Sequence, residues 1–154
     1  MKKVTIKTEK VLQVFQILKD AKYSKMSDDD KIKLWKIARA MKPVATKFEE
    51  DSKDAAEKLK PEGLDVTLEK AKDYEQKKQK GDADLPMTEA EYLEFINGDW
   101  QKFNKLVAKA VKEFADAEVE LEIDPLSEEA LQKLMSSNDW KMEQVMTVGE
   151  FLLS

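Results

Sequence analysis

Two long stretches of the chain carry apolar residues at alternating spacings of four and three, which is typical of helices that bury one continuous stripe. The first stripe consists of Leu34, Ala38, Met41, Ala45, Phe48, Ser52, Ala55 and Leu59, and the second of Leu93, Ile96, Trp100, Phe103, Val107, Ala110, Phe114 and Ala117. Small residues are common in the first stripe and aromatic residues in the second. We therefore expect the two helices to form a long antiparallel hairpin in which large residues face small ones.

Local signals set the bounds of the first long helix. Ser27 is a suitable N-cap, and the three aspartates 28–30 that follow it occupy the first turn, where carboxylates favour the positive end of the helix dipole. The helix should end near Lys60, just before Pro61. Pro43 lies inside it and removes one backbone hydrogen bond, so we expect a kink there rather than a break.

The second long helix should begin with a capping box, in which the side chains of Thr88 and Glu91 satisfy each other's backbone donors. Asn97-Gly98 is a potential breaker within it. Because the apolar stripe keeps its spacing across that pair, we predict one continuous helix over about 89–117.

Two short segments alternate apolar and charged residues in the period of a half-buried strand. Residues 3–7 would expose lysines on the outer face, whereas residues 118–123 would expose glutamates. We predict that the two segments pair, because pairing matches both the apolar faces and the opposite charges. The fold class expected is therefore mainly α, with additional short helices and a minor two-stranded sheet.

The remaining helices are shorter. We expect one that is capped by Thr8 and ends near Lys22, and a second over 65–79 whose apolar face is poor. The whole chain, 1–154, should form a single domain in which a polar segment, about 61–87, is mobile.

Near the C-terminus, Ser127 should cap a short helix that ends before Ser136-Ser137-Asn138-Asp139. A last helix is expected from Trp140 to Leu153 and should be docked on the core. Its predicted apolar side consists of Met142, Val145, Met146, Gly149, Leu152 and Leu153.

The composition excludes several classes of site. The chain has 154 residues, of which 38% are charged, and it contains neither histidine nor cysteine. Without these two residue types there can be no Ser-His-Asp or Cys-His triad and none of the usual zinc sites. The aspartates 28–30 point in different directions on a helix, so they predict a helix start rather than a metal site. No catalytic, cofactor-binding or metal-binding residues are predicted, and we expect a protein that is not an enzyme.

Lysines between Lys70 and Lys80 suggest an alternative, a regulatory or nucleic-acid-associated module. Acidic residues alternate with these lysines, and the net charge of −5 opposes binding to a polyanion. Arg39 is also the single arginine of the chain, although arginine is the residue best suited to phosphate recognition. Nucleic acid is therefore not the expected partner.

Tryptophan and methionine are the residues best able to anchor a protein interface. The candidate partner surface consists of Trp35, Trp140, Met142 and Met146. Met142 and Met146 also have an interpretation as core residues, since methionine at helical spacing usually fills the core. Trp35 is adjacent to the first stripe, and Trp140, at the start of the last helix, could instead pack against Gln144 or Val145 as a staple.

Several segments together resemble small helical proteins of unknown function encoded by phages and prophages of low-GC bacteria. These segments are Val4-Thr5-Ile6-Lys7, Lys33-Leu34-Trp35-Lys36-Ile37-Ala38-Arg39, Val119-Glu120-Leu121-Glu122-Ile123, Leu126-Ser127-Glu128-Glu129 and Asn138-Asp139-Trp140. The resemblance implies an assembly or accessory role and assigns no functional residue.

The sequence thus predicts an interaction or assembly protein that binds a protein partner, or itself, through helical faces. No stretch approaches the roughly 20 apolar residues that span a bilayer, and the basic N-terminus lacks a signal-peptide core. We therefore expect a cytoplasmic protein with no membrane, small-molecule or cofactor partner.

Overall fold

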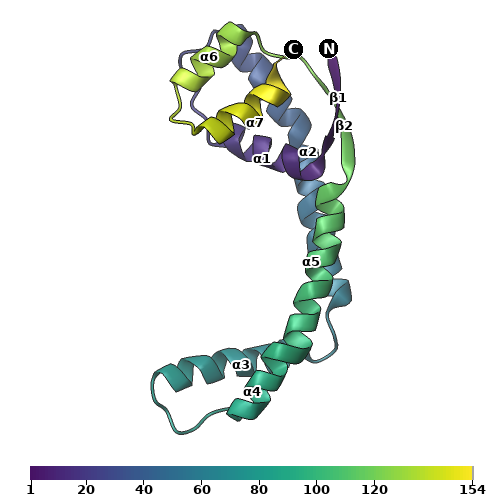
Figure 1. The fold of residues 1–154 in the computed structure, drawn as a ribbon, viewed down its shortest axis with the longest axis vertical. Coiled ribbons are helices and arrows are strands. Elements are labelled where there is room, and N and C mark those ends of the chain that lie inside the picture. The colour runs from purple at the N-terminus through teal and green to yellow at the C-terminus, as the bar shows by residue number, and fades with distance from the viewer. Residues whose placement is uncertain (154) are drawn as a thin grey trace. The chain divides into compact units, whose positions relative to one another are not determined.

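The computed structural model describes residues 1–153, most of which are helical (Figure 1). In chain order the elements are β1 (Lys2–Lys7), α1 (Thr8–Lys19), α2 (Asp28–Leu59), α3 (Leu64–Gln79), α4 (Glu89–Phe95), the π-helical turn η1 (Ile96–Trp100), α5 (Gln101–Asp116), β2 (Glu118–Ile123), α6 (Glu128–Ser136) and α7 (Met142–Leu152). The predicted mainly α fold with a minor two-stranded sheet is confirmed.

The chain divides into two compact units. The first unit comprises Met1–Glu50 together with the residues from Phe114 onward, and the second unit comprises Asp51–Glu113. Helices α2 and α5 each continue from one unit into the other. That the chain behaves as one domain with a mobile 61–87 segment stays a prediction, although α3 lies within that segment.

The sheet of the first unit pairs the two predicted strands. β1 and β2 are antiparallel, with Val4 opposite Leu121 and Lys3 opposite Glu122. The ammonium of Lys3 lies 3.7 Å from a carboxylate oxygen of Glu120 and 3.8 Å from one of Glu122. The predicted charge match is therefore present on the outer face, while the inner face packs on the helices.

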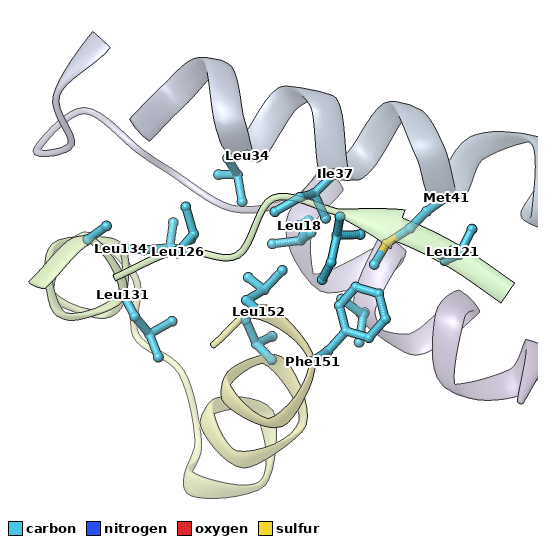
Figure 2. Close-up of a cluster of buried hydrophobic side chains, with 14 of the residues drawn as sticks. Leu18, Leu34, Ile37, Met41, Leu121, Leu126, Leu131, Leu134, Phe151 and Leu152 are labelled. Atoms are coloured by element: carbon cyan, nitrogen blue, oxygen red, sulfur yellow. The ribbon is translucent and has the colours of Figure 1, made fainter. Parts of the chain in front are cut away.

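The inner face of the sheet belongs to the main hydrophobic core of the first unit, which also takes side chains from α1, α2, α6 and α7 (Figure 2). Its largest fully buried side chains include Ile37, Met41, Leu134 and Leu152. Each such side chain contributes about 1.5–3 kcal/mol when it leaves water. The core therefore fixes the positions of α1 and α2 relative to each other.

Thr8 has a different role from the predicted one. The N-cap of α1 is Lys7, and Thr8 is buried, with 5% of its surface exposed. Its hydroxyl donates a hydrogen bond of 2.8 Å to the carbonyl of Ala117, and its backbone N–H donates one of 2.9 Å to the same oxygen. The N-cap prediction is wrong because Thr8 joins the β1–α1 corner to the residue just before β2.

Helix α2 begins as predicted. The hydroxyl of Ser27 accepts a 3.2 Å hydrogen bond from the backbone N–H of Asp30. The helix is unbroken from Asp28 to Leu59, with Pro43 inside it. Within the predicted stripe Leu34 and Met41 are buried and the other six residues are half-buried.

The second unit has a smaller core of its own. Leu64 and Ala71 of α3 are buried there with Phe95 of α4 and Phe103 of α5, and Leu59 at the end of α2 packs against this cluster. The predicted capping box is present: the N–H of Glu91 donates to the hydroxyl of Thr88 at 3.1 Å, and the N–H of Thr88 donates to the carboxylate of Glu91 at 3.2 Å.

The helical run over 89–116 is continuous, as predicted, but its apolar stripe changes phase at η1. Upstream of this turn Phe95 is buried, with 6% of its surface exposed, whereas Leu93 is 47% exposed. A π-helical turn holds one more residue than an α-helical turn, so Phe95, five residues before Trp100, also faces the second core, next to Ile96 of the predicted stripe, which packs against it. The rings of Phe95 and Trp100 are stacked, with centroids 6.2 Å apart. The prediction that the stripe keeps its phase across Asn97-Gly98 is wrong.

At the C-terminus, α6 is capped by the hydroxyl of Ser127 as predicted. Helix α7 begins at Met142, two residues later than expected, and buries Val148, Phe151 and Leu152. Met142 and Met146 of the predicted apolar side are 72% and 66% exposed.

The buried side of α7 is rotated by about one residue from the prediction. Leu153 leaves the helix in an extended conformation and forms a parallel β-bridge with Leu126. The backbone N–H of Leu126 donates a 2.8 Å hydrogen bond to the carbonyl of Leu152. The predicted docking of the chain end is therefore confirmed up to Leu153.

Candidate interaction surface

Three large apolar side chains of the first unit are exposed where α1 ends and α2 begins. Tyr23 is 50% exposed, Ile32 is 51% exposed and Trp35 is 57% exposed. All three line a hollow of about 380 Å³ whose other lining residues are Leu18, Lys19, Lys31, Leu34 and Ala38. Exposed apolar residues that are clustered rather than scattered mark interaction sites.

A larger hollow of about 830 Å³ continues along α2. Its lining residues are Phe15, Lys19, Trp35, Ala38, Arg39, Lys42, Pro43, Thr46, Lys47 and Glu50. Lys19, Trp35 and Ala38 line both hollows, so the two adjoin and together make up one surface. We call it the Trp35 groove.

One face of α2 forms the long wall of the groove. Ile32, Trp35, Arg39, Lys42 and Thr46 follow one another at spacings of three and four residues. This row is offset by one residue from the buried positions of the same helix. Since consecutive residues of an α-helix are about 100° apart, α2 presents one face to the core and the adjacent face to the groove.

The floor of the groove is part of the core. Leu18 of α1 and Leu34 of α2 line the groove, yet each is only 5% exposed. Both belong to the core cluster of the first unit, where Figure 2 shows them among the other buried side chains. Because interiors are closely packed, a floor made of core side chains gives the groove a preformed shape.

The loop that carries Tyr23 is held by Asn138, which lies between α6 and α7. The backbone N–H of Lys22 donates a 2.8 Å hydrogen bond to the side-chain oxygen of Asn138, and the side-chain amide of Asn138 donates one of 2.7 Å to the carbonyl of Lys22. The Asn138 amide also donates to the carbonyl of Leu134 at 2.8 Å. This contact ties the open end of the groove to a helix far along the sequence.

The rim of the groove is basic. Lys19, Arg39 and Lys42 line it, and the guanidinium carbon of Arg39 lies 5.2 Å from the centre of the Trp35 ring. Glu50 is the one carboxylate among the groove-lining residues. The positive potential of this surface therefore contrasts with the net charge of −5 of the whole chain.

The four predicted surface residues do not line one surface. Trp35 lies in the groove, whereas Met142 and Met146 are exposed on α7 and do not line it. Trp140 is half-buried and packs against the core. Sequence reasoning missed Tyr23 and Ile32.

A signal for Ile32 was present in the sequence. It lies three residues before Trp35 and outside the heptad stripe, on the face that also carries Arg39 and Lys42. Tyr23 gave no such signal, because its place beside α2 depends on the tertiary contact with Asn138.

Two of the lysines between Lys70 and Lys80 have partners within the second unit. Lys77 lies 3.2 Å from the carboxylate of Asp73, and Lys78 lies 3.7 Å from that of Glu89. The ammonium of Lys78 also donates a 3.2 Å hydrogen bond to the hydroxyl of Tyr74, and this bond, with the nearby Glu89 carboxylate, raises the pKa of Lys78. Both cations therefore have intramolecular partners on the surface of the second unit.

An aromatic pair lies beside these lysines. The rings of Tyr74 and Tyr92 are stacked with centroids 4.7 Å apart, and the Tyr92 hydroxyl donates a hydrogen bond to Glu75, which raises the pKa of Tyr92. These contacts hold α3 against α4.

Acidic residues do not converge in the described part of the chain. Within residues 1–153, no group of three or more carboxylates is placed to hold a metal ion. The aspartates 28–30 occupy the first turn of α2, where Asp28 lies 3.9 Å from Lys31.

Within residues 1–153, no helix has the length and apolar character needed to cross a membrane. No protein-family model matches this sequence, and no curated protein or solved structure shows a significant match to it.

Proposed function

We propose that this protein is a non-enzymatic interaction module that binds a protein partner, or a second copy of itself, through the Trp35 groove. The observation that carries the proposal is the exposure of Trp35, at 57%, beside an apolar hollow whose floor is formed by the core residues Leu18 and Leu34. Tryptophan that lies at the centre of an apolar depression is the residue most often responsible for binding energy at protein interfaces.

The surroundings of Trp35 support this assignment. The Arg39 guanidinium over its ring reduces the number of orientations that the indole can adopt, so less conformational entropy is lost when a partner covers it. Ile32 and Tyr23 extend the apolar surface on one side of the ring. An assembly or accessory role in the cytoplasm, of the kind implied by the resemblance to phage-encoded proteins, would use such a surface.

A photo-crosslinking experiment tests the proposal. A benzophenone amino acid is introduced at Ile32 in the groove and, in a matched control, at Met146, which is 66% exposed in the same unit. The proposal predicts a discrete crosslinked species at the groove position in lysate of the native host, or a crosslinked dimer of the pure protein.

The crosslink should be absent at the control position and should disappear when Trp35→Ala is added. Trp35→Ala is expected to fold normally, since the side chain is more than half exposed. Equal crosslinking at both positions, or a groove crosslink that survives loss of Trp35, would contradict the proposal.

A further inference from the structure

The groove has the shape of a site for a helix. The wall formed by α2 from Ile32 to Thr46 is about 21 Å long at 1.5 Å per residue, the length of a helical segment of about four turns. The side chains of this wall recur every three or four residues, so a partner helix that places apolar residues at i, i+3, i+4 and i+7 can pack between them.

The charge of the rim specifies the partner further. Lys19, Arg39 and Lys42 place cations beside the apolar floor, and Glu50 is the one carboxylate at the end of the groove. A partner with acidic residues flanking its apolar stripe would face these cations, whereas a partner with basic flanks would be repelled. From this combination we infer that the Trp35 groove binds an acidic amphipathic helix of a partner protein.

This inference rests on the proposed function and adds the chemistry of the ligand. A surface with cations and an exposed tryptophan could also bind an anionic membrane or a nucleic acid. However, the groove presents a concave apolar floor, and the chain carries a net charge of −5, which repels an extended polyanion. A helix with a few acidic residues on its flanks matches the small number of rim cations without that general repulsion.

The test uses fluorescence anisotropy with two stapled helical peptides of about 14 residues, the length that spans the wall. Both carry leucines at i, i+3, i+4 and i+7, and they differ only in that one has glutamates and the other lysines on the flanking positions. The full-length protein is compared with Arg39→Glu/Lys42→Glu and with the matched control Lys102→Glu/Lys105→Glu, which makes the same charge change on exposed residues of α5 in the second unit.

The acidic peptide should bind the unmodified protein at least tenfold more tightly than the basic peptide at low salt, and this preference should shrink as salt screens the charges. Charge reversal at Arg39 and Lys42 should weaken binding of the acidic peptide about tenfold and allow the basic peptide to bind. Charge reversal at Lys102 and Lys105 should leave the preference for the acidic peptide unchanged. Trp35→Ala should weaken whichever peptide binds by at least tenfold.

Equal affinity for the two peptides, no binding of the acidic peptide at low salt, or an unchanged preference after reversal of Arg39 and Lys42 would overturn the inference. Vesicles containing phosphatidylserine and a single-stranded oligonucleotide serve as further probes. Binding to either one that depends on Arg39 and Lys42 and exceeds that of the acidic peptide would also overturn it. The photo-crosslinking experiment at Ile32 does not use these peptides. A result that overturns the acidic-helix inference therefore does not by itself overturn the proposed function.

Discussion

Thr8 offers a direct test of the corner that joins β1 to α1, because its two interpretations predict opposite effects for the same substitution. As an N-cap, Thr8 could be replaced by aspartate without loss, since aspartate is at least as good as threonine at that position and also favours the helix dipole. In the structure the Thr8 hydroxyl instead donates to the carbonyl of Ala117 at 2.8 Å, and 5% of the residue is exposed. An ionised carboxylate cannot donate that bond.

The expected magnitudes follow from these contacts. Thr8→Val keeps the shape and removes only the hydroxyl, while the backbone N–H of Thr8 still donates to Ala117, so it should lower the free energy of unfolding by about 1 kcal/mol. Thr8→Asp places a charge against a carbonyl oxygen in a nearly buried position and should cost about 3 kcal/mol at pH 7. Thr8→Ser keeps the donor and should lose only about 0.8 kcal/mol with the methyl group.

Urea denaturation followed by far-UV circular dichroism measures these differences, with Thr5→Val on the exposed face of β1 as the control. The predicted order of stability is Thr, Ser, Val, Asp. The pKa of the introduced carboxyl should be raised in the folded state, because its protonated form can donate to Ala117. Its cost, relative to the unmodified protein at the same pH, should therefore appear as the pH rises from about 4 to 7. A Thr8→Asp variant as stable at pH 7 as the unmodified protein would refute the tertiary role and restore the N-cap interpretation.

Three further substitutions and two deletions test other parts of the structure. Leu134→Ala should lower the free energy of unfolding by about 2–5 kcal/mol, measured by urea denaturation, because this side chain is fully buried in the first core. Asn138→Ala should cost about 1–2 kcal/mol and should increase hydrogen exchange at the amide of Lys22, which loses its acceptor. Gly63→Ala should cost about 1 kcal/mol in the same denaturation assay, because Gly63 has a φ of +82°. Deletion of Asn97 should change the free energy of unfolding by no more than about 1 kcal/mol relative to the unmodified protein, whereas deletion of Asn104 should lower it by more than that.

Elements with strong local patterns were predictable from the sequence. The strand segments 3–7 and 118–123 alternate strictly and carry opposite charges, so their pairing followed from the pattern although more than a hundred residues separate them. The caps Ser27, Thr88 and Ser127 are local arrangements of three or four residues, and all three are present.

The N-cap prediction for Thr8 was wrong because the contact that decides its role is not part of the local sequence pattern. A threonine before a helix has the same sequence signal whether its hydroxyl caps the helix or bonds to a distant carbonyl. Only the position of Ala117 decides between the two roles. The candidate surface was likewise only partly predictable from local sequence. Trp35 was found from its residue type, but the groove around it depends on Leu18 and Tyr23, which the fold brings next to α2.

The phase change at η1 leads to the deletion prediction, because a π-helical turn is an α-helical turn with one residue added. Removing Asn97 from η1 would leave Phe95 four residues before the tryptophan that follows, so an ordinary α-helix would keep both rings on the buried face. Removing Asn104, an exposed residue of α5, would instead rotate Phe103 and everything upstream by about 100° relative to Val107. The first deletion should therefore be tolerated and the second should cost at least 3 kcal/mol, as measured by thermal denaturation of both variants. Equal destabilisation by the two deletions would show that η1 is not an added residue in one continuous helix.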